Sequence, residues 1–175
     1  MNRFFAVSIL FSLFAHQVFS QTIKEIRYYS EVGTFLLNSI VEKGKIFSET
    51  EIRLMKQNKN IWLAEYKTKG EKSTEIIDVK RKKYKYKGCD NWNFLQLEKP
   101  NIIKSKKDSL INGLLCNKLY MVAGKDSLTI WYYKKLKKYN VFYNYMRYVP
   151  GLPVLVLTSN NKYYYKLLSV SYSKD

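Results

Sequence analysis

Short segments in which apolar and polar residues alternate follow one another along most of the chain, separated by polar or glycine-containing turns. In residues 45–55, for example, Ile46, Thr50, Ile52 and Leu54 fall on one side of an extended chain. A period of two is typical of a β-strand with one buried face. Turn signals such as Asn112-Gly113 recur at a spacing of about 8–12 residues, which favours an all-β fold. The sequence shows no long amphipathic helical pattern, and it predicts a mainly β protein.

The segments add up to about nine or ten strands in a single domain, residues 21–175. We expect a curved antiparallel sheet, an open half-barrel or a barrel-like structure, with few short helices. Residues 31–43 are predicted as a strand or a short helix, and residues 88–107 as a loop or short helix packed on the sheet. The expected strands are residues 22–29, 45–55, 61–68, 74–87, 110–111, 114–122, 128–133, 154–158 and 162–172.

A proline-rich corner precedes the last two expected strands. Pro150, Gly151, Leu152 and Pro153 lead directly into the apolar run 154–157. The prolines fix φ and donate no backbone hydrogen bond, whereas the glycine lets the chain turn sharply. We therefore interpret these four residues as a structural motif, a rigid corner that feeds a buried strand.

The first twenty residues are typical of a secretory signal peptide. Arg3 provides a short positive region, residues 4–14 are almost wholly apolar, and Ser20 is a small residue at the expected cleavage position. The apolar run is shorter than the roughly 20 residues of a transmembrane helix, and no later segment is long and apolar enough to span a bilayer. We expect export without a transmembrane span, to the periplasm, the outer membrane or the medium.

The chain carries 31 basic and 14 acidic residues, a formal net charge of +17. A charge this large raises the concentration of anions near the surface. In an exported protein the partners could be anionic lipid, lipopolysaccharide, an acidic glycan or an envelope protein; nucleic acid is a poor candidate because it would need an extracellular role. The alternative is that the lysines only protect exposed strand edges from aggregation.

The single histidine, His16, lies in the expected signal peptide. The remaining chain therefore lacks the residue for Ser-His-Asp or Cys-His catalysis and for most transition-metal sites. No glycine-rich phosphate loop or nucleophile-elbow motif occurs either. We expect no metal, no cofactor and no enzymatic activity.

Tyrosines and lysines alternate in residues 80–87, and tyrosines recur in residues 139–148. Basic strands with aromatic residues can bind anionic ligands. The alternative is an amphipathic strand whose tyrosines pack on the core and whose lysines face water. The candidate ligand-binding residues are Tyr84, Tyr86, Lys83, Lys85, Tyr143 and Tyr145.

Cys89 and Cys116 are the chain's two cysteines. An even pair in an exported protein suggests a disulfide, which would close a loop of about 28 residues and stabilise the fold by roughly 3–4 kcal/mol. The alternative is two separate thiols, with Cys116 buried in a strand. The spacing does not fit a redox-active pair or a metal site.

Three segments in the second half of the chain resemble a known family. Residues 111–118 resemble an Ile-x-Gly-Tyr-x-Cys element, residues 129–132 a Trp-Tyr strand, and residues 151–156 a Gly-Leu-Pro-Gly-Leu-Ile segment. Together they resemble the GLPGLI family, exported proteins of unknown function from Bacteroidetes-type bacteria. Val154 and Val156 replace the second glycine and the isoleucine, and Leu115 lies between the Gly113 and Cys116 matches. The resemblance implies an exported β-rich protein and supplies no catalytic residues.

The sequence thus favours an exported binding module for an amphiphilic or anionic envelope ligand. A structural or accessory envelope protein that docks to a protein partner is the alternative. The two differ in where a ligand would sit, since a binding module needs a concavity that its own side chains leave open.

Overall fold

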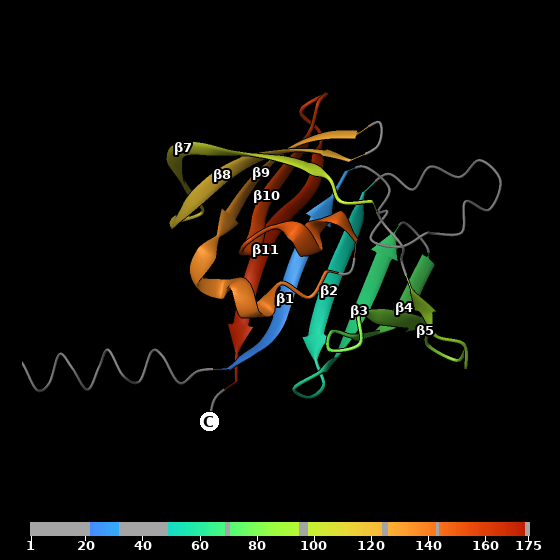
Figure 1. Ribbon diagram of the computed structural model, residues 1–175. Coiled ribbons are helices and arrows are strands. Elements are labelled where there is room, and N and C mark those ends of the chain that lie inside the picture. The colour runs from blue at the N-terminus through green and yellow to red at the C-terminus, as the bar shows by residue number, and fades with distance from the viewer. Residues whose placement is uncertain are drawn as a thin grey trace, which may run out of the picture.

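The computed structural model describes residues 22–31, 49–68, 71–94, 98–123, 126–142 and 144–173. They form one antiparallel sheet of 11 strands in the order β6-β5-β4-β3-β2-β1-β11-β10-β9-β8-β7 (Figure 1). The sheet is open, with β6 and β7 as its two edges, which confirms the predicted mainly β fold class with an antiparallel sheet and few short helices. The strands are β1 (Ile23–Ser30), β2 (Thr50–Lys56), β3 (Ile61–Thr68), β4 (Glu71–Asp78), β5 (Lys83–Tyr86), β6 (Asn93–Phe94), β7 (Asn101–Ile111), β8 (Leu114–Ala123), β9 (Asp126–Tyr133), β10 (Leu152–Thr158) and β11 (Tyr163–Tyr172).

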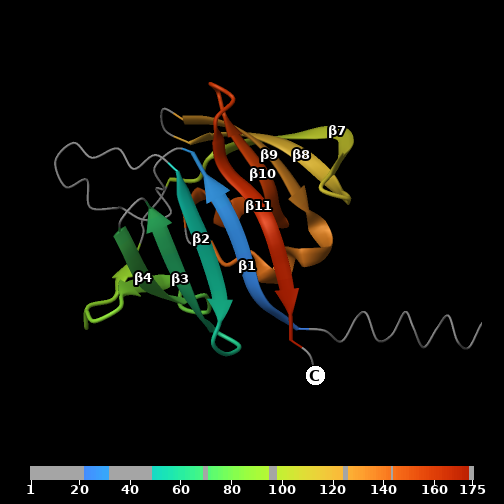
Figure 2. The same ribbon diagram turned by 180° about the vertical axis from the view of Figure 1, so that it is seen from behind.

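The first and last strands are neighbours in the middle of the sheet. β1 pairs with β11 on one side and with β2 on the other, both antiparallel. From this central pair, β2 to β6 follow one another outwards in one direction, and β10 to β7 in the other. The sheet twists strongly, so that β7 runs almost across the direction of β1 and β2 (Figure 2).

One face of the sheet carries the core and is covered in its middle by the connection between β9 and β10. This connection contains two 3-10 turns, η1 (Lys134–Tyr139) and η2 (Tyr145–Tyr148), which lie in front of β1 and β11 in Figure 1. Asn140 holds the two turns together, because its side-chain amide donates to the carbonyl oxygens of Met146, at 2.9 Å, and Val149, at 3.1 Å. We call the covered face the inner face and the opposite one the outer face.

The predicted alternation is confirmed in the strands that pair with β1 and its neighbours. In β2, Thr50, Ile52 and Leu54 are buried while Glu51 and Arg53 are exposed. In β3, Trp62, Ala64 and Tyr66 are buried on the same inner face. Each of these strands therefore buries one row of side chains, as a period of two requires.

Two expectations for the middle of the chain were wrong. Residues 74–87 form a hairpin of β4 and β5 rather than one strand, because Asp78 accepts a hydrogen bond from the backbone N–H of Arg81, at 2.9 Å, and Lys82 adopts a positive φ of 55°. This aspartate-based turn contains no glycine or proline that would mark it in the sequence.

The second wrong expectation concerns residues 101–111, which were expected as part of a loop or short helix followed by one brief strand. They form the long edge strand β7, whose lysines and serines are mostly exposed and do not alternate with apolar residues.

At the corner formed by residues 150–153, the backbone of Gly151 lies very close to β9. A Cβ on Gly151 would lie 2.7 Å from Cδ2 of Tyr132 and 2.8 Å from the carbonyl oxygen of Tyr133, distances that no side chain tolerates. Pro153 pairs with Tyr132 of β9, whereas the β10–β11 ladder runs only from Leu155 to Leu157 in β10. The missing N–H of Pro153 thus falls where no ladder bond to β11 is needed.

Some sequence predictions fall on residues outside the described ranges. The signal peptide at residues 1–20 and most of the segment 31–43 belong to this group, as does Tyr143. Within the described part of the chain, no helix has the length and apolar character to cross a membrane.

Candidate functional site

The middle of the inner face is filled by the protein's own side chains. The rings of Tyr28, Phe142 and Tyr165 pack against one another with centroids 5.1–6.0 Å apart, and all three are buried. Asn144 donates to the hydroxyl oxygen of Tyr165, at 3.3 Å. The tyrosines at this place are therefore core residues, and a ligand would have to bind elsewhere.

The candidate residues of β5 lie on opposite faces of the sheet. Tyr84 is buried on the inner face, where its ring meets that of Tyr86 edge to face at 6.4 Å. On the other face, Nζ of Lys83 lies 4.2 Å and Nζ of Lys85 lies 5.5 Å from the centre of the Trp92 ring. The tyrosines and lysines are thus separated by the sheet, and both lysines contact an aromatic ring of their own chain.

A buried carboxylate lies among the inner-face tyrosines next to β5. Glu75 of β4 is fully buried and pairs with Ala64 of β3 and Tyr86 of β5. Burial, and then the negative charge of Glu75, raise the pKa of the Tyr66, Tyr84 and Tyr86 hydroxyls, that of Tyr86 to about 12. The cluster stays protonated on its tyrosines at neutral pH, so its hydroxyls can donate to the carboxylate.

Tyr145, the other described aromatic candidate, begins η2 and packs partly buried against the core. It lies on the connection above the middle of the inner face, whereas the β4–β5 hairpin lies near the β6 edge of the sheet. The residues predicted to bind a ligand therefore do not form one site.

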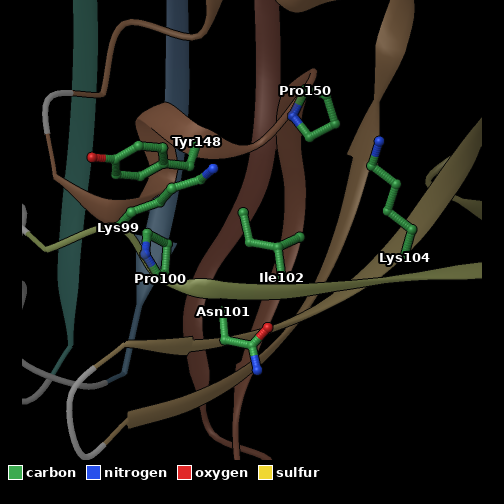
Figure 3. A pocket seen from close by; sticks show the side chains of 7 residues that line it. All are labelled: Lys99, Pro100, Asn101, Ile102, Lys104, Tyr148 and Pro150. Carbon is green, nitrogen blue, oxygen red and sulfur yellow. The ribbon is translucent and has the colours of Figure 1, made fainter.

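An open pocket lies where β7 passes the end of η2. Its volume is about 530 Å³, within the range of small-molecule sites. Figure 3 shows Ile102 pointing from β7 toward Pro150, with Tyr148 and Lys99 on one side and Lys104 on the other. The lining residues are Lys99, Pro100, Asn101, Ile102, Lys104, Tyr148 and Pro150.

The pocket lining carries positive charge and no carboxylate. Its two cations are Lys99 and Lys104, and Asn101 adds an amide. Beside it, Nη2 of Arg147 donates to the hydroxyl oxygen of Tyr148 at 2.9 Å, which fixes that ring and adds a third cation. Pro100, Ile102, Pro150 and the face of Tyr148 form the apolar part. The arrangement can hold a molecule with one anionic and one apolar end.

Both cysteine thiols are free, which corrects the expectation of a disulfide. Cys89 is exposed after β5, whereas Cys116 is buried in β8, with seven strands between β5 and β8 in the sheet. Burial, followed by the charge of Asp108, raises the pKa of the Cys116 thiol to about 11. An even cysteine count gave no indication that the two residues lie near opposite ends of the sheet.

The ionic contacts on the outer face of β1 to β3 form a second charged cluster. Glu25 accepts hydrogen bonds from Arg27 at 2.5 Å and from Arg53 at 2.6 Å, and Glu65 contacts Arg53 at 3.8 Å and Lys72 at 3.1 Å. Opposite charges are matched here, so we interpret the cluster as structural. Among the described residues, no three potential ligands of the His, Cys, Asp or Glu type lie close enough to hold a metal ion.

Comparisons with known proteins bear on the fold alone. No family model and no curated protein matches the chain. A solved structure of PNGF-II in the C2 space group is similar, with a TM-score of 0.55 and 16% sequence identity over 89% of this chain. The chain spans about 28% of the length of that protein. At this identity the likeness indicates a shared arrangement of strands.

The sequence indicated only part of the pocket. The proline corner contains Pro150, and Tyr148 belongs to the tyrosine-rich segment 139–148 that precedes it. The lysines of the pocket gave no signal, because Lys99 and Lys104 belong to a chain with many lysines. Only the passage of β7 over η2 brings these two lysines next to Tyr148 and Pro150, which lie about fifty positions later in the sequence.

Proposed function

We propose that this protein is an exported, non-enzymatic binding protein for an anionic amphiphile, a small molecule with a carboxylate or phosphate group and an apolar chain. The proposal rests on one observation, a pocket of about 530 Å³ that combines Lys99 and Lys104 with an apolar wall and has no acidic side chain in its lining. Lysine ammonium groups bind such anions as point charges. The net charge of +17 would concentrate the ligand near the surface.

The filled inner face supports this choice of site. Because Tyr28, Phe142 and Tyr165 occupy the middle of that face, a ligand cannot enter there without unfolding the core. The pocket lies at the margin, between the edge strand β7 and the corner at Pro150, and is open to solvent. Export is supported by the signal-peptide pattern of residues 1–20.

Calorimetric titration with dodecanoate and with dodecyl phosphate, below their micellar concentrations, tests the proposal. We expect binding that weakens with salt, and a loss of about tenfold or more in the double variant Lys99→Gln/Lys104→Gln, because a contact to a charged group contributes about 1.5–3 kcal/mol. Uncharged dodecyl maltoside should bind more weakly. The two acids distinguish a carboxylate from a phosphate ligand.

The matched control is Lys106→Gln/Lys107→Gln, which removes the same charge from β7 without touching the pocket lining. It should change the affinity by less than about twofold, apart from the general effect of net charge. Equal losses in the two variants would show that only the overall charge matters and would refute a specific site, and so would the absence of binding to either acid.

The edge strand β7 favours a second candidate function, a structural or accessory envelope protein that docks to a partner. β7 is 11 residues long and largely exposed, and among the described strands it pairs only with β8. Such an edge can accept a strand from another protein. The lysines of β7 and the irregular β7–β8 register near residues 104–108 oppose nonspecific pairing of β7 with strands of other proteins. Because β7 carries several lysines, a partner strand would need acidic residues. A stoichiometric protein partner in a pull-down, without ligand binding in the titration, would favour this function.

We also propose that the chain is a divergent member of the GLPGLI family. What supports this is that the three similar segments fall in adjacent parts of the sheet. Residues 111–118 include the start of β8, residues 129–132 lie in β9, and residues 151–156 enter β10. A profile search started from homologues of this chain should retrieve the family; failure of that search would remove the proposal.

A further inference from the structure

Large apolar side chains are exposed mainly at one end of the sheet. Among the described residues, eight such side chains are exposed, and five of them lie on β7 and β8. They are Ile103, Leu110, Leu115, Tyr120 and Val122. A concentration of this kind on one hairpin is unusual for a surface that faces only water, and it marks an interaction surface.

Three of these residues form a contiguous group on the outer face. Leu119, Met121 and Ala123 of β8 point into the core, so Tyr120 and Val122, which alternate with them, point outward. Ile103 of β7 is the cross-strand partner of Tyr120. The exposed fractions are 59% for Ile103, 43% for Tyr120 and 46% for Val122.

A lysine between two aromatic rings borders this apolar group. Nζ of Lys118 lies 4.9 Å from the centre of the Tyr120 ring and 4.7 Å from that of Trp131, its cross-strand partner in β9. Across the sheet, Trp131 pairs with Leu155 of β10, and Leu155 pairs with Lys166 of β11. Nζ of Lys166 lies 4.9 Å from the centre of the Tyr163 ring. We call Ile103, Lys118, Tyr120, Val122 and Trp131 the outer apolar surface; it contains one cation, Lys118, and no acid.

The composition of this surface fits a lipid bilayer better than a soluble polyanion. Tyrosine and tryptophan prefer the boundary between headgroups and acyl chains, and a lysine near an anionic bilayer is attracted to it. A glycan or a nucleic acid could stack on the rings and contact the lysines but would offer nothing to Ile103 and Val122. We therefore propose that the outer apolar surface docks on an anionic membrane surface, with Ile103 and Val122 entering the headgroup region.

This docking does not depend on the proposed ligand pocket. Ile102 and Lys104, which line the pocket, alternate with Ile103 along β7 and therefore lie on the opposite side of that strand. The two surfaces can be altered one at a time. Charge complementarity supports the choice of an anionic rather than a neutral bilayer, since the chain carries a net charge of +17.

Cosedimentation with vesicles tests the inference. With vesicles of equal parts phosphatidylglycerol and phosphatidylcholine, we expect the full-length mature chain to bind, and Ile103→Ser/Val122→Ser to lower the partition coefficient about tenfold. The variant Lys118→Gln should bind more weakly and lose less affinity when salt is added, because one cation fewer contacts the headgroups. Vesicles of phosphatidylcholine alone should bind the wild type much more weakly.

The matched control is Leu168→Ser/Tyr172→Ser on β11, which removes two exposed apolar side chains of similar exposure, 49% and 45%, from another part of the sheet. It should leave vesicle binding within about twofold of the wild type. Binding that survives Ile103→Ser/Val122→Ser, that falls equally in the control, or that is absent in the wild type would overturn the inference. The variant Lys99→Gln/Lys104→Gln separates the two proposals. It should weaken the binding of dodecyl phosphate, whereas its binding to vesicles should still be lowered by Ile103→Ser/Val122→Ser.

Discussion

The hydroxyl group of Tyr28 donates a hydrogen bond to the carbonyl oxygen of Pro153, 2.8 Å away, although β11 separates their strands β1 and β10 in the sheet. The contact crosses the inner face just where the β10–β11 ladder has not yet begun. It connects the proline corner to the central strand of the fold. Tyr28 is fully buried, and burial raises the pKa of its hydroxyl well above the usual range, so the hydroxyl stays protonated and able to donate.

Replacing Tyr28 with phenylalanine should remove this bond and keep the ring contacts with Phe142 and Tyr165. We expect the free energy of unfolding to fall by about 1–3 kcal/mol, because a buried carbonyl loses its donor. Urea unfolding followed by fluorescence measures the change. Tyr120→Phe, on the exposed outer face, is the control and should alter the free energy by less than about 0.5 kcal/mol. A Tyr28→Phe protein as stable as the wild type would mean that the bond contributes nothing.

Alanine at Gly151 should destabilise the fold through a steric clash. The new methyl group would lie 2.8 Å from the Tyr133 carbonyl oxygen, a backbone atom that cannot move independently. We expect a loss of about 1–3 kcal/mol. Gly88→Ala provides the comparison, because no atom lies within 4 Å of its added methyl group and only the positive φ of 92° opposes it. Thermal melting should rank Gly151→Ala below Gly88→Ala; the reverse order would contradict the close approach at the corner.

Glu25 should make stability depend on pH. The hydrogen bond from Arg53 lowers the pKa of this carboxyl below its ordinary value of 4.5, against the effect of burial, and Arg27 lowers it further. The ionised form is therefore favoured in the folded protein. Its stabilising effect is present above pH 4.5 and is lost as the pH falls through the lower folded pKa.

The substitution Glu25→Gln should cost about 1 kcal/mol at pH 7, since both arginines are about half exposed. The difference from the wild type should shrink in urea unfolding at pH 3. Glu98→Gln, on an exposed connection, should show neither effect. A difference of the same size at both pH values would rule out ionisation of Glu25 as its cause.

The two cysteines should react with alkylating reagents at very different rates. At pH 8 the exposed Cys89 should be labelled quickly by iodoacetamide, whereas Cys116, whose pKa is raised to about 11, should react only after unfolding. Mass spectrometry of the native and the urea-unfolded protein, without reductant, should show one and two labels respectively. A protein that takes up no label even when unfolded would contain the disulfide after all.

The sequence predicted the sheet well where turns contain Asn, Gly or Pro and one strand face is buried. β3, β8 and β11 fall close to their expected bounds for this reason, and β2 ends close to its expected end. The β4–β5 turn was missed because Asp78 makes it with a side-chain hydrogen bond and the turn contains no glycine or proline. Most of β7 was missed because the majority of its side chains are exposed, so its sequence needs no strict alternation.

The candidate site was harder to predict than the fold, since it depends on contacts between distant segments. Tyr84 and Tyr86 were selected for their spacing, and the spacing correctly placed them on one face away from Lys83 and Lys85. The alternative stated for this strand, with tyrosines packed on the core, is the arrangement observed for the buried Tyr84. The pocket, in turn, joins Lys99 to Tyr148, and no local pattern relates a lysine before an edge strand to a tyrosine in a 3-10 turn.

The position of the first and last strands side by side has a consequence for how the sheet could be rewired. The backbone N–H of Ser173 donates to the carbonyl oxygen of Thr22 at 2.8 Å, so a short linker could join these residues. Opening the joined chain between Phe94 and Asn101 would give the strand sequence β7-β8-β9-β10-β11-β1-β2-β3-β4-β5-β6, in which every strand pairs with the next along the chain. This circular permutant would be a simple meander in which all strand pairings join neighbours in sequence, and it should fold faster than the natural chain, whose β1 and β11 must be brought together across the sequence.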